Sequence, residues 1–132
     1  MRVTLAGYLS DHMGRVLLQR VSERSLEPVT CPWPAGQAPA QALAAAFRAA
    51  TGLYVLPVRL VAVYYGDDAL TLSYRCTLRG GELATPEGQP PAGFFDPQPS
   101  PRGLSRAQAR QLDDALRHGG GPATLAQGGG PG

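Results

Sequence analysis

The first part of the chain alternates between apolar and polar residues in two runs separated by a turn. In residues 2–10, every second position is apolar or glycine, which is the pattern of a half-buried strand. These positions are Val3, Leu5, Gly7 and Leu9. Residues 15–21 form a second β-rich run, and residues 11–14 between them have the composition of a turn. The pattern predicts a β-hairpin.

The apolar spacing changes to that of a helix in residues 38–52. Ala40 to Ala50 are almost all strong helix formers. Leu43 and Phe47 are four positions apart and share a face that can be buried. Pro39 suits the first turn of a helix, and Gly52 suits the position after the last turn. A helix that packs by one stripe is therefore predicted here.

The region after this helix is β-rich. Residues 54–65 favour a strand, although Pro57 restricts the first part to an edge or an irregular lead-in. After a turn at 66–68, residues 70–78 alternate well enough to predict another strand. Residues 22–36 are expected to be a polar, proline-containing loop.

The chain is loop-like from residue 86 to 103, with a short apolar island at 93–95. A last helix is predicted over residues 105–117, because Ser105 and Gln108 have the spacing of a capping box. The order of elements indicates an α+β fold in one domain, residues 1–118. Glycine and proline dominate residues 119–132, which are predicted to be a flexible tail.

Charge and cysteine content narrow the classes of function. The net charge of +2 is too small to indicate nucleic-acid binding. All basic residues are arginine, and they form no cluster in the sequence that would predict a phosphate clamp. Cys31 and Cys76 lack metal-site spacing and are expected to be reduced thiols of a cytoplasmic protein. No signal peptide and no membrane-spanning run are predicted.

Three segments together resemble one known family. The opening V-T-L-A-G-Y-L-S-D-H-M-G-R-V-L-L-Q-R is similar to a first hairpin, and G-F-F-D-P is similar to a late strand. Between them, W-P-A-G-Q-A-P-A-Q-A-L-A-A-A-F-R-A-A-T-G-L is similar to a central signature. The family is that of the Nudix hydrolases, which cleave nucleoside diphosphates linked to another group. The resemblance covers residues 2–117 and implies a mixed β-sheet sandwiched between helices.

The family signature is G-x5-E-x7-R-E-U-x-E-E-x-G-U, with U a bulky apolar residue. When it is aligned from its end, its apolar and glycine positions agree with Phe47, Gly52 and Leu53. Its upstream glutamate falls on a glutamine, and its arginine and three further glutamates fall on alanines. These positions are Gln37, Ala45, Ala46, Ala49 and Ala50.

The missing carboxylates bear directly on activity. The resemblance implies glutamates that hold magnesium, which prefers about six hard oxygen ligands. Methyl groups supply no ligand, and the side-chain amide of Gln37 is neither charged nor basic. The sequence therefore predicts no catalytic residue and no metal ligand in this helix, and no required cofactor.

Other residues offer weaker candidates for chemistry or binding. Glu87 lies in a late loop where some members of the family place an extra carboxylate, but a solvated loop acid is the favoured interpretation. Asp67 and Asp68 are assigned to turn chemistry, and Asp113 and Asp114 to the solvated face of the last helix. Candidate ligand-binding side chains, each weighed against core packing or solvation, are Trp33, Arg48, Tyr65 and Phe95.

Three hypotheses of function remain open. The leading one is a degenerate Nudix-like domain that lacks metal-dependent hydrolysis but keeps a cleft for a nucleotide, a nucleoside diphosphate derivative or a protein partner. The second is a working hydrolase with magnesium held by carboxylates outside the helix, such as Glu87 or Asp67. The third is a structural domain that forms a homodimer through a strand edge.

Overall fold

The computed structural model describes residues 1–117 and 123–126. Two helices and eight strands form in these residues. In chain order they are β1 (Arg2–Leu9), β2 (Val16–Ser22), β3 (Ser25–Glu27), β4 (Val29–Pro32), α1 (Pro39–Thr51), β5 (Leu53–Gly66), β6 (Ala69–Gly81), β7 (Ala92–Phe95), α2 (Arg106–Arg117) and β8 (Ala123–Ala126).

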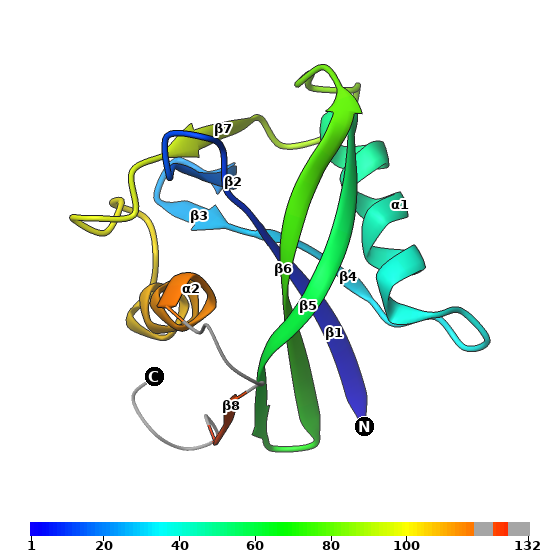
Figure 1. Ribbon diagram of the computed structural model, residues 1–132. Helices are drawn as coiled ribbons and strands as arrows, with labels where there is room; N and C mark the ends of the chain where they lie inside the picture. Colours follow the sequence, from blue (N-terminus) through cyan, green and yellow to red (C-terminus); the bar gives the residue numbers. More distant parts are fainter. Residues whose placement is uncertain (118–122, 127–132) are drawn as a thin grey trace.

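The strands form two sheets. The central sheet has the order β4-β1-β6-β5-β8, and the smaller sheet has the order β3-β2-β7. In the central sheet β1 is parallel to β6 and β5 is parallel to β8, whereas the other pairs are antiparallel. Figure 1 shows α1 and α2 on opposite sides of the long β5–β6 pair. The predicted α+β class, with a mixed sheet between helices, is confirmed.

Helix α1 begins and ends at the residues that the sequence indicated. Pro39 is in its first turn, and Gly52 after its last turn has φ 77°, a left-handed conformation that glycine adopts at little cost. The N–H of Gly52 donates to the carbonyl of Arg48 at 3.1 Å. The ring of Phe47 lies so close to β1 that a Cβ on Gly7 would be 2.3 Å from its Cε2 atom. The glycine in the first strand therefore allows the helix to approach the sheet.

The predicted hairpin of the first two strands is wrong in its pairing. The strands form where expected, but only an isolated bridge between Ser10 and Val16 joins them. Beyond it β1 enters the central sheet and β2 enters the smaller one. Strand β1 finds its partners in β4 and β6, so pairing across the whole chain outweighs pairing across the turn.

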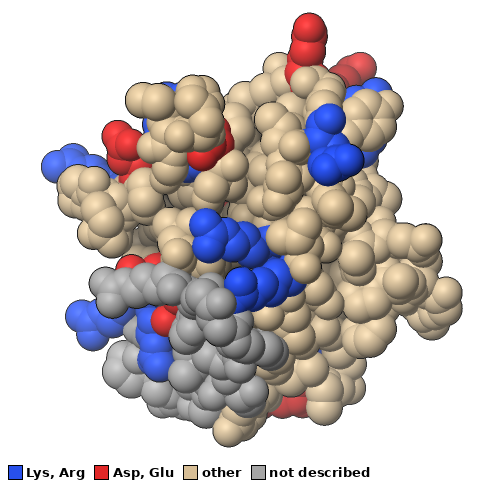
Figure 2. Space-filling model, viewed as in Figure 1, with Lys and Arg blue, Asp and Glu red and all other residues tan. Residues whose placement is uncertain are grey.

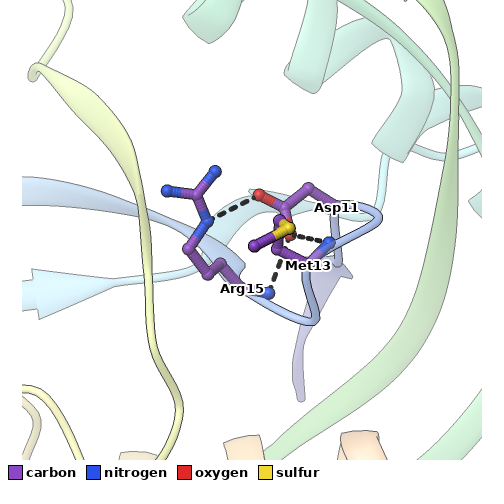
Figure 3. A network of polar contacts seen from close by, with 3 residues as sticks. All are labelled: Asp11, Met13 and Arg15. Atoms are coloured by element: carbon purple, nitrogen blue, oxygen red, sulfur yellow. Dashed lines mark hydrogen bonds and ion pairs between the residues drawn. The ribbon is translucent and has the colours of Figure 1, made fainter.

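The turn itself is held by one carboxylate (Figure 3). Asp11 Oδ1 accepts the N–H groups of Met13 and Arg15 at 2.9 and 2.8 Å, and Oδ2 accepts Arg15 Nε at 2.9 Å. Desolvation is the largest single influence and raises the pKa of Asp11, but the three hydrogen bonds and the Arg15 charge together outweigh it, so the pKa is lowered. The predicted turn is confirmed, with an aspartate rather than glycine alone fixing it.

Two predicted loops contain strands. The apolar island at 93–95 belongs to β7, which pairs with β2 across Val16 to Gln19. Residues 22–36, expected to be a loop, contain β3 and β4. Both segments are short and lack clear alternation, so only their partner strands define them. Pro57 does lie on a strand edge, because β8 pairs with β5 only at residues 62–65.

The predicted capping box of the last helix is present. Ser105 Oγ accepts the N–H of Gln108 at 3.1 Å, and Gln108 Oε1 accepts the N–H of Ser105 at 2.8 Å. Within the predicted flexible tail, Ala123–Ala126 form β8 beside β5. The edge of β5 supplies the pairing partner for this segment. The remainder of the tail, 119–122 and 127–132, lies outside the described residues.

Two apolar clusters lie on opposite faces of the central sheet. The first joins α1 to the sheet and contains Leu5, Leu9, Leu17, Val29, Ala42, Leu43, Phe47, Leu53, Val55 and Cys76. The second joins α2 to the sheet and contains Ala6, Tyr8, Val16, Leu18, Leu26, Val61, Leu112 and Ala115. Successive residues of β1 and β2 alternate between the clusters, as the period of a strand requires.

Candidate functional site

Helix α1 carries the positions that the sequence resemblance assigns to chemistry, and they do not share one exposed face. Ala45 and Ala49 are exposed, Ala46 is half-buried against the core, and Ala50 is buried. The helix contains no carboxylate, and Figure 2 shows no acidic side chains on the right-hand surface over α1. The alanine side chains at these positions do not fit magnesium, which needs oxygen ligands. No group of three or more His, Cys, Asp or Glu residues in the described part of the chain could hold a metal ion.

The loop before α1 holds Trp33 in place. Its indole Nε1 donates to the backbone carbonyl of Gln37 at 2.8 Å, and the Gln37 N–H donates to the carbonyl of Pro34 at 3.3 Å. The residue is 41% exposed. The loop therefore presents a fixed aromatic face to solvent, and Gln37 takes part through its backbone.

The end of α1 holds Arg48. Its guanidinium donates to the carbonyl of Gly52 and lies 4.0 Å from the ring centroid of Tyr54. Both contacts stabilise the end of the helix, the first by satisfying a carbonyl and the second by a cation–π interaction. The structure thus shows an internal role for this side chain.

Tyr65 lies on the same face of the central sheet as α1. Its neighbour Tyr64 points to the opposite face, where its hydroxyl donates to Asp114 of α2, and successive strand residues point in opposite directions. Tyr65 is 48% exposed near the end of β5. It is therefore available to a ligand on the α1 side.

Trp33 and Tyr65 flank one end of the sheet. The register aligns Val3 with Leu70 and Leu70 with Tyr65, and the N–H of Trp33 donates to the carbonyl of Val3 at 3.1 Å. Val3 and Leu70 are half-buried. Two strand spacings separate Val3 from Tyr65, about 10 Å. We call the surface formed by these residues, Trp33, Val3, Leu70 and Tyr65, the aromatic shelf.

The remaining aromatic candidate, Phe95, lies elsewhere. It pairs with Val16 in the smaller sheet and packs against the apolar cluster beneath α2. Arg48 is near the opposite end of α1 from Trp33, about 14 Å along the helix from its first residue, Pro39. The structure therefore places Trp33 and Tyr65 at the same end of the sheet, but not Arg48 or Phe95.

The candidate acids lie in turns. Glu87 is exposed in a turn closed by the Gln89 N–H and the Pro86 carbonyl at 3.0 Å. Asp68 has φ 54° in the β5–β6 turn, and its carboxylate lies 3.4 Å from the amino-terminal nitrogen. Asp67 is exposed beside it. These positions agree with the predicted turn and loop chemistry.

A polar cluster beneath α2 is not predicted by the sequence pattern. Asp114, expected on a solvated face, is half-buried and accepts the Tyr64 hydroxyl at 2.7 Å. The hydroxyls of Tyr8 and Ser73 are buried on the same face, without a hydrogen-bond partner among the described residues. Burial raises the pKa of both tyrosines above their ordinary value, followed by the Asp114 charge at Tyr8 and by the hydrogen bond to Asp114 at Tyr64. The tyrosines are 56 positions apart, so no local motif reveals the cluster.

Both cysteines are free thiols. Cys76 is buried beneath α1, and burial raises the pKa of its thiol to about 12. Cys31 is half-buried in β4, and its pKa is also raised by burial. A raised pKa keeps the thiol protonated and unreactive. The predicted free, partly buried state is confirmed.

The sequence shows no arginine cluster, but the fold creates one. Arg20, Arg24 and Arg102 line a single pocket, together with Glu23 and Gly103. Arg20 and Arg102 are 82 positions apart. The absence of an arginine cluster from the linear sequence therefore does not hold for the folded chain.

Comparisons with solved structures identify the fold. An ADP-ribose pyrophosphatase from Streptococcus suis is 18% identical, with 94% of this chain and 98% of that chain covered and a TM-score of 0.79. A MutT mutator protein from Bacillus halodurans is 15% identical, with 98% and 92% covered and a TM-score of 0.79. A Nudix hydrolase from Nitrosomonas europaea is 16% identical, with 96% and 78% covered and a TM-score of 0.77.

Sequence comparisons give no further relative, because no protein-family model and no curated protein matches the chain. Among the described residues, none of the helices has the length and apolar character needed to cross a membrane. The structural likeness extends over almost the whole chain, as the sequence resemblance implied. The chain has the fold of the Nudix hydrolases.

Proposed function

We propose that this chain is a degenerate Nudix-like domain that does not hydrolyse its ligand and binds a nucleotide or a protein partner at the aromatic shelf. The observation that carries the proposal is the chemistry of α1. Positions that would hold a metal against a diphosphate are Ala46, Ala49 and Ala50, and methyl groups cannot ligate a cation. The domain therefore needs no metal cofactor. The free thiols of Cys31 and Cys76 support a place in the reducing cytoplasm.

The ligand class follows from the surface beside α1. Trp33 and Tyr65 expose aromatic rings at the two sides of the shelf, and partly buried aliphatic side chains form its floor. Stacking on aromatic rings contributes about 1–3 kcal/mol per nucleobase. The structural neighbours include an ADP-ribose pyrophosphatase and a UDP-X diphosphatase. A nucleoside diphosphate derivative is therefore the first ligand to test.

Thermal unfolding with added ligand tests this proposal. ADP-ribose or a nucleotide should raise the unfolding temperature equally with and without magnesium, because a ligand of the folded state stabilises it by mass action. Trp33→Ala should remove the rise. Met13→Ala, an exposed apolar residue in a distant turn, is the matched control and should leave it unchanged. A rise that requires magnesium would contradict the proposal.

A hydrolase with carboxylates outside α1 is a second candidate. The N–H of Ala84 donates to the carbonyl of Thr51 at 2.9 Å, which ties the loop that carries Glu87 to the end of α1. If this loop supplies catalysis, Glu87→Gln should abolish any hydrolysis that the wild type shows. Gln89→Ala, in the same turn, should leave it unchanged.

A homodimer is the third candidate, and the β5 edge favours it. Residues 53–61 have no strand partner on the outer side among the described residues, and Tyr54, Leu56 and Val58 are exposed there. Such an edge can pair with a second copy. Light scattering should then give twice the monomer mass, and Val58→Lys should restore the monomer. Binding of a nucleotide by the Val58→Lys monomer would separate this role from the first proposal.

A further inference from the structure

The pocket with the three arginines lies between the β2–β3 turn and the segment before α2. Its volume is about 450 Å³, and it is lined by Arg20, Glu23, Arg24, Arg102 and Gly103. The N–H of Leu26 donates to the Gly103 carbonyl at 2.9 Å, so a hydrogen bond fixes the two walls together.

Gly103 also allows the two walls to approach closely. It has φ +106°, a conformation that L side chains rarely adopt, and a Cβ there would be 3.2 Å from the Leu26 nitrogen. This geometry keeps the arginine that precedes it beside the β2–β3 turn. The pocket is therefore part of the fold rather than a chance approach of two loops.

Positive charge predominates in this pocket, because three arginines and one glutamate line it. Arg20 Nη1 donates to the carbonyl of Glu23 at 3.2 Å, and this contact holds its guanidinium over the turn. Arg24 and Arg102 are exposed, and none of the three arginines forms an ion pair with an acid in residues 1–117. Their charge is thus available to an anion.

We propose that this pocket binds the phosphate group of a small phosphorylated molecule. Guanidinium groups bind phosphate through paired N–H donors, and arginines that converge on one pocket supply several such pairs. A volume of about 450 Å³ is within the range of small-ligand pockets. A long nucleic acid is disfavoured, because it would require a broad basic surface and the whole chain carries only +2.

The pocket is separate from the surface beside α1. Figure 1 shows β3 on the other side of the central sheet from α1, and the lining residues include no member of the aromatic shelf. The inference therefore goes beyond the proposed function, and either can fail alone. If both hold, the domain offers a stacking surface and an anion site at different places.

Calorimetric titration at low ionic strength tests the site with two ligands, inorganic pyrophosphate and AMP. Both should bind, and Arg102→Ala should weaken binding at least tenfold, because a guanidinium–phosphate pair is lost. Arg79→Ala removes the same charge from an exposed position on β6 outside the pocket and should weaken binding less than twofold. Arg102→Lys should give an intermediate affinity, and Glu23→Gln should strengthen binding about threefold.

Three results would overturn the inference. The first is no binding of either ligand by the wild type, and the second is equal weakening by Arg102→Ala and Arg79→Ala, which would indicate general charge attraction. The third is binding of a single-stranded oligonucleotide that is far tighter than binding of AMP and that Arg102→Ala abolishes. Circular dichroism of each variant checks folding. Arg24→Ala removes a second guanidinium, from the wall of the pocket opposite Arg102. Pyrophosphate binding without AMP binding would retain the site and restrict its ligand to inorganic phosphates.

Discussion

The face of the central sheet that carries α1 is apolar, whereas the face that carries α2 holds polar side chains. On the first, the Phe47 ring packs against Gly7 without an intervening side chain. On the second, the Tyr64 hydroxyl donates to the half-buried Asp114, and the Tyr8 hydroxyl is buried without a hydrogen-bond partner among the described residues. A ligand bound on the α1 side, as proposed, would meet the exposed alanines of the helix and the rings of Trp33 and Tyr65. Its binding should therefore depend mainly on shape and stacking.

The strongest test of the apolar face is removal of its central ring. Phe47→Ala should lower the free energy of unfolding by about 3–5 kcal/mol, because the ring is fully buried. Gly7→Ala should cost about 1–3 kcal/mol by overpacking against that ring. Combined, the two should cost less than their sum, since the new methyl group enters the space left by the ring. Urea unfolding measures all three variants, and simple additivity would contradict this packing.

A second comparison uses two adjacent alanines of α1. Ala50→Glu should cost about 2–4 kcal/mol, because it places a carboxylate against the core. Ala49→Glu, one position earlier and exposed, should cost at most about 1 kcal/mol, mainly from its place at the negative end of the helix. Equal costs in thermal or urea unfolding would show that the helix is rotated from the described position.

Two neighbouring tyrosines compare the faces directly. Tyr64→Phe should cost about 1–3 kcal/mol, because it removes the hydroxyl that donates to Asp114. Tyr65→Phe should change stability by less than about 0.5 kcal/mol, because its ring is half exposed on the opposite face. Chemical unfolding of both variants provides the measurement. If Tyr65→Phe were the more costly change, the assignment of faces in β5 would be reversed.

Alkaline pH should destabilise the fold through groups on both faces. The pKa of Cys76 is raised by burial to about 12 from 9.0, and the pKa values of Tyr8 and Tyr64 are raised above 10.0. The folded chain then retains protons that the unfolded chain releases. This stability is fully present below about pH 9 and is lost as pH rises through the folded pKa values. The loss between pH 8 and 10 should be about 1–2 kcal/mol.

The Cys76→Ala variant isolates the thiol in that pH series. Its stability should fall less steeply between pH 8 and 10 than that of the wild type, because one proton difference between the folded and unfolded chains is gone. An unchanged slope would assign the alkaline loss to the tyrosines alone.

The sequence predicts the parts of this fold that depend on neighbouring residues. Helix α1, its stop at Gly52 and the capping box of Ser105 and Gln108 are all set within a few positions. The sequence also shows which positions of the signature lack a carboxylate, because a signature is a linear pattern. Trp33 and Tyr65 are named as separate candidates, but their shared place at one end of the sheet requires the strand register.

Features that depend on distant contacts are not predicted. The separation of β1 and β2 into different sheets follows from partners that come later in the chain. Asp114 looks solvated on a helical pattern, and only the sheet beneath α2 supplies Tyr64 as its donor. Arg20 and Arg102 converge because Gly103 is bound to β3, a contact that has no linear motif.

A hydrolysis panel tests the central claim most directly. The purified wild type would be incubated with ADP-ribose, nucleoside triphosphates and UDP-sugars, with and without magnesium, and released phosphate and nucleoside monophosphate would be quantified. We predict no magnesium-dependent release for any of these compounds, because the alanines of α1 cannot hold the ion. Magnesium-dependent release of a nucleoside monophosphate by the wild type would contradict the account, whether or not the release persists in Glu87→Gln.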